Sequence, residues 1–75
     1  MTPEVRLELL QQSERRVQVL AECIEQLRER LQQMEERGWD SYSTSLELAK
    51  WQRLLSQHVR ERDRLREQGR VEATG

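Results

Sequence analysis

The sequence predicts an all-α protein, an antiparallel two-helix hairpin that completes a four-helix bundle by dimerisation or by pairing with a partner. Two observations predict this fold. The only Pro is Pro3 and the internal Gly residues are Gly38 and Gly69, so two long segments contain no turn-forming residue. Within both segments, apolar residues recur at the spacing of a helix face. We therefore expect a hairpin over residues 1–69 and a flexible tail over residues 70–75.

Residues 3–37 are predicted to form the first helix. Thr2 suits the N-cap, Pro3 suits the first helical position, and Glu4 complements the positive end of the helix dipole. Arg37 falls in the last turn, and Gly38 can adopt the left-handed conformation that closes a helix. The core positions form two tracks with seven-residue spacing: Leu10, Val17, Ile24 and Leu31, with Ser13, Leu20, Leu27 and Met34 beside them.

A turn over residues 38–40 is predicted to lead into a second helix over about residues 41–68. Small polar residues and two aromatic residues, Trp39 and Tyr42, mark this region. The helix has two candidate starts. Either Asp40 is the cap, which we favour, or Thr44 is the cap and forms a capping box with Glu47. Gly69 is expected to end the helix.

The second helix has one main core stripe, formed by Leu48, Trp51, Leu55, His58, Arg62 and Leu65. A start at Asp40 also places Tyr42, Leu46 and Ala49 on successive turns, where we expect them to pack beside the end of the first helix. The short turn makes the helices antiparallel neighbours. Because the first helix is predicted to be longer, we expect its N-terminal end, with Val5, Leu7, Leu9 and Leu10, to overhang the second.

Composition and charge restrict the class of function. A chain of 75 residues with 35% hydrophobic and 36% charged residues cannot bury a large core alone, so we expect it to associate with itself or with a small helical protein. The net charge of −1 gives no overall field toward nucleic acid or membrane, and no segment has the apolar length of a membrane span. We expect no secretory signal, and the single Cys suits a reducing compartment, which favours the cytoplasm.

The sequence contains no grouping that predicts catalysis, so we expect a protein that is not an enzyme and needs no cofactor. His58 falls on the core stripe. Its expected role there is structural, with pH sensing or contact with a partner as the alternative. Cys23 is predicted to be a buried small side chain, with a reactive or cross-linking thiol as the alternative. One His and one Cys on different helices do not make a metal site.

The predicted partner-binding surface consists of apolar and aromatic residues on both helices. Aromatic residues dominate the binding energy of many interfaces, and Trp39 is expected either to plug the hairpin or to anchor a partner. The full predicted set is Leu7, Leu9, Leu10, Val17, Ile24, Leu31, Trp39, Tyr42, Leu48, Trp51 and Leu55.

Four basic residues, Lys50, Arg53, Arg60 and Arg64, lie on the side of the second helix opposite its apolar stripe. Such a basic stripe is commonly a solvated face. The alternative is a Rop-like homodimeric four-helix bundle in which two copies of the stripe bind structured RNA, with an affinity that falls steeply with salt.

The segment from Arg37 to Tyr42 resembles the small helical-hairpin chaperones of type III secretion systems. Arg37, Gly38 and Tyr42 are similar to positions in the co-chaperones of needle subunits, and Trp39 with Asp40 is similar to the Trp-Asp pair that opens the second helix of flagellar export chaperones. The resemblance covers about residues 20–60, and the turn is shorter than in the needle co-chaperones. It implies a hairpin that binds another small helical chaperone through its apolar face, without catalysis, in the bacterial cytoplasm.

Overall fold

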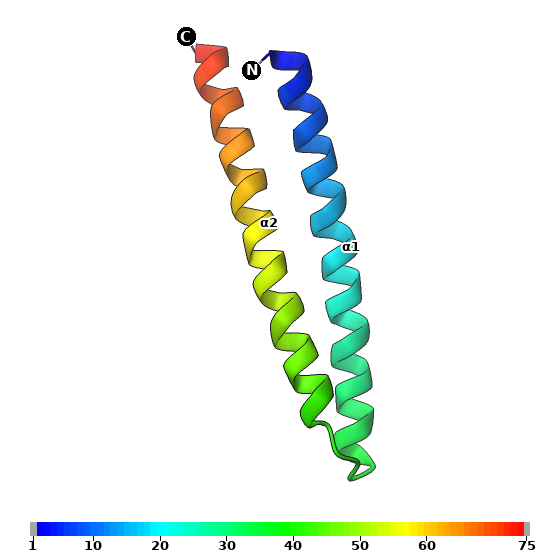
Figure 1. Ribbon diagram of the computed structural model, residues 1–75. Helices are drawn as coiled ribbons and strands as arrows, with labels where there is room; N and C mark the ends of the chain where they lie inside the picture. The colour runs from blue at the N-terminus through cyan, green and yellow to red at the C-terminus, as the bar shows by residue number, and fades with distance from the viewer. Residues whose placement is uncertain (1, 75) are drawn as a thin grey trace.

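The protein is an antiparallel hairpin of two long helices, which confirms the predicted all-α fold (Figure 1). A computed structural model describes the backbone of residues 2–74 and the side chains of residues 2–71. Helix α1 spans Pro3–Glu36 and helix α2 spans Tyr42–Thr74, and residues 2–74 contain no strand. The molecule measures 57 × 15 × 14 Å, so the two helices form a single layer.

Helix α1 begins where the capping residues predict. Thr2 is the N-cap, with φ −74° and ψ 153°, and its hydroxyl accepts a hydrogen bond from the backbone N–H of Val5 at 3.3 Å. Pro3 occupies the first turn, where its missing N–H leaves no donor unpaired, and Glu4 lies in the same turn near the positive end of the helix dipole.

A glycine closes helix α1 as predicted, although Arg37 is the C-cap and lies just beyond the last turn. Gly38 has a φ of +70°, and its N–H donates to the carbonyl oxygen of Glu35 at 3.1 Å. The N–H of Trp39 donates to the carbonyl oxygen of Met34 at 2.9 Å. These two bonds form a Schellman motif, which satisfies carbonyl groups that the helix end would leave unpaired.

Replacing Gly38 with alanine is expected to lower the free energy of unfolding by about 1–2 kcal/mol, the cost of a left-handed backbone for a residue with a Cβ. No atom lies within 4 Å of the added Cβ, so the change isolates backbone strain from steric overlap. Urea titration followed by circular dichroism measures the effect. Gly38→Asn is the control and should lose less stability, because asparagine tolerates this conformation. Equal losses in the two variants would contradict the prediction.

Helix α2 begins one residue later than predicted. The N–H of Tyr42 donates to Asp40 Oδ1 at 3.0 Å, but the first backbone bond of the helix joins the N–H of Ser45 to the carbonyl of Ser41 at 2.9 Å. Asp40 therefore caps the turn that precedes the helix, and the connection extends through Ser41. The alternative cap, Thr44 with Glu47, is wrong, because Thr44 lies inside the helix and its buried hydroxyl is 3.4 Å from Met34 Sδ.

The predicted end of helix α2 is also wrong. The helix continues through Gly69 to Thr74, so residues 70–74 belong to it, and Gly75 lies outside the described residues. Gly69 serves a different purpose from the expected helix stop. A Cβ at this position would overlap the guanidinium group of Arg6, so the glycine makes room for a side chain of the facing helix. One glycine inside a helix costs only about 1 kcal/mol relative to alanine.

Gly69→Ala is expected to stabilise the hairpin most when Arg6 is also shortened. In an Arg6→Ala background the added methyl group meets no guanidinium, so the full helix propensity gain of about 0.8–1 kcal/mol should appear. With Arg6 present, the guanidinium must move and the gain should shrink. Thermal unfolding of the four proteins in this double-mutant cycle measures the difference. Additive effects would contradict the close approach of Arg6 to Gly69.

The core positions predicted for both helices are confirmed. Together they form the contact between α1 and α2, which we call the seam. All eight positions of the two α1 tracks are buried or half-buried, and so are the six stripe residues of α2. Five side chains are buried at the helix contact: Ser13, Leu20, Ile24, Thr44 and Leu65. The seam is regular because core positions repeat every three and four residues in both helices, which keeps their apolar faces together along the whole contact.

Two packing expectations are wrong. Tyr42 and Leu46 are 70% and 55% exposed, and Ala49 is exposed as well, because Thr44 takes the seam position at the start of α2. The N-terminal end of α1 does not overhang, since α2 has 33 residues against 34 in α1. The first turn of α1 and the last turn of α2 lie at the same end of the molecule, opposite the connecting turn (Figure 1). The α1 end still exposes Val5, Leu7 and Leu9.

Candidate interaction surface

The hairpin buries little apolar surface within itself. Among the residues that the structure describes, Leu20, Ile24 and Leu65 are the hydrophobic side chains that are buried. The other apolar seam residues are half-buried, because one facing helix covers only one side of each. A two-helix layer therefore leaves the flanks of its seam open to a further contact.

The eleven residues predicted to bind a partner fall into two groups. Seven contribute to the contact between α1 and α2 and are buried or half-buried: Leu10, Val17, Ile24, Leu31, Leu48, Trp51 and Leu55. Four are exposed: Leu7, Leu9, Trp39 and Tyr42. The first group thus builds the hairpin itself, and of this group Trp51 also lines an open surface described next. Partner binding by these residues stays a prediction.

One flank of the seam forms a groove, which we define by two adjoining hollows. The first hollow is lined by Arg15, Arg16, Val19, Leu20, Leu54 and His58, and its walls are almost wholly apolar. The second continues it one turn further along both helices. Leu20 and Cys23 on α1, like Trp51 and Leu54 on α2, are three residues apart and share a helix face, so the two hollows form one surface.

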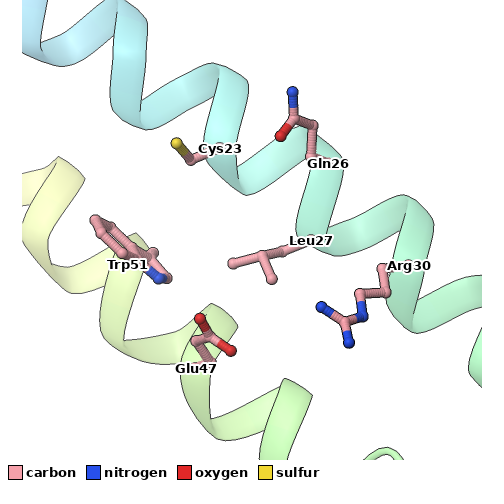
Figure 2. Close-up of a pocket in the computed structure, with 6 residues that line it drawn as sticks. All are labelled: Cys23, Gln26, Leu27, Arg30, Glu47 and Trp51. Carbon is pink, nitrogen blue, oxygen red and sulfur yellow. The ribbon is translucent and has the colours of Figure 1, made fainter.

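The second hollow, nearer the turn, combines apolar and charged walls. It is lined by Cys23, Gln26, Leu27, Arg30, Glu47 and Trp51. Figure 2 shows Leu27 and Arg30 of α1 pointing across the hollow toward α2, where Trp51 and Glu47 form the facing wall. An arginine and a glutamate thus face each other at this end of the groove, with apolar side chains beside them.

Two groove residues, Val19 and Leu54, were not among the predicted partner-binding residues. Val19 is 52% exposed although it is a valine in the middle of α1. Leu54 is half-buried at the edge of the seam. Neither falls on a seven-residue track, so a search for core positions passes over both. The signal that finds them is an apolar residue next to the seam on the same flank as Cys23.

The opposite flank of the seam contains an ion pair between the helices. Glu14 and Arg66, on different helices, form an ion pair there, with Arg66 Nη2 3.0 Å from Glu14 Oε1. Both side chains are about half exposed, so the pair contributes at most about 1 kcal/mol. This ion pair lies outside the groove, on the flank that also carries Ala21 and the half-buried Val59.

The turn presents its aromatic residues to solvent. Trp39 is 58% exposed, and the guanidinium carbon of Arg37 lies 5.1 Å from the centre of its ring, a cation–π contact. Tyr42 is 70% exposed. Of the two roles expected for Trp39, a plug buried in the hairpin is wrong, and the role of partner anchor stays a prediction.

His58 and Cys23 both line the groove. The imidazole of His58 is half-buried, its Nδ1 makes no hydrogen bond among the described residues, and that atom lies 3.8 Å from Glu61 Oε2. The carbonyl oxygen of His58 accepts a hydrogen bond from the Ser13 hydroxyl at 3.5 Å. Cys23 has a free, half-buried thiol in the other hollow. The two side chains thus lie in different halves of the groove.

The four residues of the basic stripe are all exposed on α2. Several other arginines of this helix are paired, as Arg62 is with Asp63 at 3.2 Å and Arg70 with Glu67 at 3.5 Å. Lys50, Arg53, Arg60 and Arg64 form no ion pair with another described residue. Their charge is available to a ligand.

The described part of the chain contains no cluster of three or more His, Cys, Asp or Glu residues placed to hold a metal ion. Neither helix, over its described residues, has a stretch long and apolar enough to cross a membrane. Comparisons with protein-family models, with curated proteins and with solved structures find no match to the chain.

Proposed function

We propose that this protein is a non-catalytic interaction module that binds a helical partner through the groove, and that it acts as a small chaperone, adaptor or regulator. One observation carries the proposal: a chain of 75 residues buries three hydrophobic side chains among its described residues and leaves an apolar groove beside its seam. A partner that packs one or two helices in this groove would complete a bundle of three or four helices.

The chemistry of the groove supports binding over catalysis. Nucleophilic catalysis needs a base within hydrogen-bond reach of the nucleophile. Cys23 and His58 line separate hollows, and Nδ1 of His58 lies 3.8 Å from a carboxylate of its own helix, Glu61. The apolar wall at Val19, Leu20 and Leu54 instead suits side chains of another helix.

Concentration-dependent unfolding tests the proposal. If the groove needs a partner, the isolated chain either becomes more stable as its concentration rises, through self-association, or fails to unfold cooperatively without a different partner. The measurement combines light scattering with thermal unfolding over a hundredfold range of concentration. A monomer that unfolds cooperatively at a midpoint independent of concentration would overturn the proposal.

A narrower form of the proposal is a chaperone of type III secretion acting in the cytoplasm. It rests on the resemblance at Arg37 to Tyr42 and is supported by the exposure of Trp39 and Tyr42, which leaves both aromatic residues free to contact a partner. Purification from the native host should then recover a second small helical protein, and a Trp39→Ala, Tyr42→Ala variant should lose it. Recovery of this chain alone would refute the narrower form and leave the general one.

Binding of structured RNA is the second candidate function. It is favoured by the exposure of Lys50, Arg53, Arg60 and Arg64 without ion pairs to described residues. A gel-shift assay with a hairpin RNA should show binding at low salt that weakens steeply as salt rises. A variant with all four residues changed to glutamine should lose the shift. The absence of any shift at low salt would dismiss this candidate.

A further inference from the structure

We propose that the groove docks a second copy of this chain, with the two hairpins face to face and their turns at the same end of the dimer. The inference rests on the proposed function and names the partner and its orientation. In this arrangement α1 of one copy packs on α2 of the other. The argument comes from the distribution of charge along the groove.

The groove has an apolar centre with an opposite-charge pair at each end. At its centre lie Cys23 and Leu54, one from each helix. Toward the turn, Arg30 of α1 and Glu47 of α2 line the same hollow. Toward the chain ends, Arg16 lines the hollow that His58 shares, and His58 lies 3.8 Å from Glu61. Among these four side chains, both arginines come from α1 and both glutamates come from α2.

These charges are spaced symmetrically about the centre. Arg16 and Arg30 lie seven residues before and after Cys23, and Glu47 and Glu61 lie seven residues before and after Leu54. Seven residues are two helical turns, so all four charged side chains project on the same flank as the groove centre.

The symmetry of the charges discriminates between the two ways in which copies can pair by a two-fold axis through the groove centre. If the turns lie at opposite ends, each helix faces its own copy in reverse, so Arg16 meets the other Arg30 and Glu47 meets the other Glu61. If the turns lie at the same end, α1 faces α2 of the other copy, so Arg16 meets Glu61 and Arg30 meets Glu47. Like charges placed opposite each other disfavour association, so the same-end pairing is favoured.

The face is large enough for a stable dimer. The hairpin measures 57 × 15 × 14 Å, so a contact along its whole length has an area on the order of the ~800 Å² that each partner buries in a standard interface. The contact would also cover Val19, which is 52% exposed in the single chain. The dimer would be a four-helix bundle with its core built from both seams.

Charge reversal at one groove position tests the surface. Arg30→Glu should weaken self-association about tenfold, because the reversal occurs twice in a symmetric dimer and opposes Glu47 each time. Sedimentation equilibrium measures the dissociation constant. Arg28→Glu is the matched control, since Arg28 is exposed on the flank opposite the groove and the change in net charge is the same. Equal effects of the two reversals would overturn the docking surface.

A distance between spin labels tests the orientation. A single label is placed at Glu36→Cys, an exposed position next to the turn, in a Cys23→Ala background whose mass is first confirmed to be that of the dimer. With turns at the same end, the two labels lie within a few helix widths, roughly 20–30 Å apart. With turns at opposite ends, they lie apart by nearly the 57 Å length of the hairpin. The longer distance would overturn the proposed orientation.

The outcomes separate this inference from the proposed function. A chain that folds only with a different protein refutes the second copy as the occupant but keeps the interaction module. A dimer whose Arg30→Glu variant associates as tightly as the wild type refutes the groove as the docking surface, and a dimer whose labels are far apart refutes the orientation; both keep the interaction module. A stable monomer with concentration-independent unfolding refutes both.

Discussion

Replacing Leu65 with alanine is expected to lower the free energy of unfolding by about 2–4 kcal/mol, the usual cost of truncating a buried leucine. Leu65 is 6% exposed and is the buried hydrophobic side chain in the C-terminal half of α2, among the described residues. Arg62 and Gly69, the residues three before and four after it, carry no apolar branch that could replace the lost methyl groups. In a chain of this size, such a loss removes a large part of the total stability.

Leu46→Ala provides a matched control on the same helix. Leu46 is 55% exposed, so removing the same atoms should change the free energy of unfolding by no more than about 0.5 kcal/mol. Urea titrations of both variants at one protein concentration measure the difference, because any self-association adds to the stability of each in the same way. If the two variants lose equal stability, the seam does not extend to this part of α2.

The sequence predicts the seam of this hairpin well because the periodicity is strong and consistent. Four core residues of α1, from Leu10 to Leu31, repeat at an interval of seven, and the stripe of α2 keeps the same spacing through Arg62. The sequence also predicts both ends of α1 well. At Thr2 and Gly38 only a few residue types suit the local backbone and its hydrogen bonds.

The end of α2 was not predictable from local signals. Gly69 looks like a helix stop in the sequence, but the helix continues through it, and the side chain nearest to it is Arg6, which is far away in the chain and close only once the hairpin forms. The alternative cap at Thr44 is wrong for a related reason. Thr44 resembles a cap, but contact with Met34 buries it inside the helix. In both cases a contact between helices decides what one residue does.

The groove was only partly predictable, because a seven-residue repeat locates the seam and says nothing about which flank stays open. Trp51 was placed on the partner surface, but Val19 and Leu54 were not. Which flank carries the groove becomes visible only when the two helices are aligned in the hairpin. Val19 and Leu54 border the flank with the groove, whereas the ion pair of Glu14 and Arg66 lies on the other flank. The same alignment is needed to see the symmetric placement of four charged residues, Arg16, Arg30, Glu47 and Glu61.

Ser13 shows that a polar residue in a heptad track need not be a defect. It occupies a core position between Leu10 and Val17, and at 2% exposure it is the most buried side chain of the described residues. Its hydroxyl donates to the carbonyl oxygen of His58 at 3.5 Å, near the upper limit for a hydrogen bond. The side chain therefore matters chiefly for its small volume, which lets the two helices approach closely.

Ser13→Leu is accordingly expected to lower the free energy of unfolding by about 1–3 kcal/mol, although it completes the apolar track. The larger side chain has no space against the backbone of α2 at His58 and must push the helices apart. Ser13→Ala keeps the volume small and removes only a long hydrogen bond, so its effect should stay within about 1 kcal/mol. Urea titration with circular dichroism compares the two variants at one concentration. A more stable Ser13→Leu protein would show that the helices separate freely at this position and that close approach is not required.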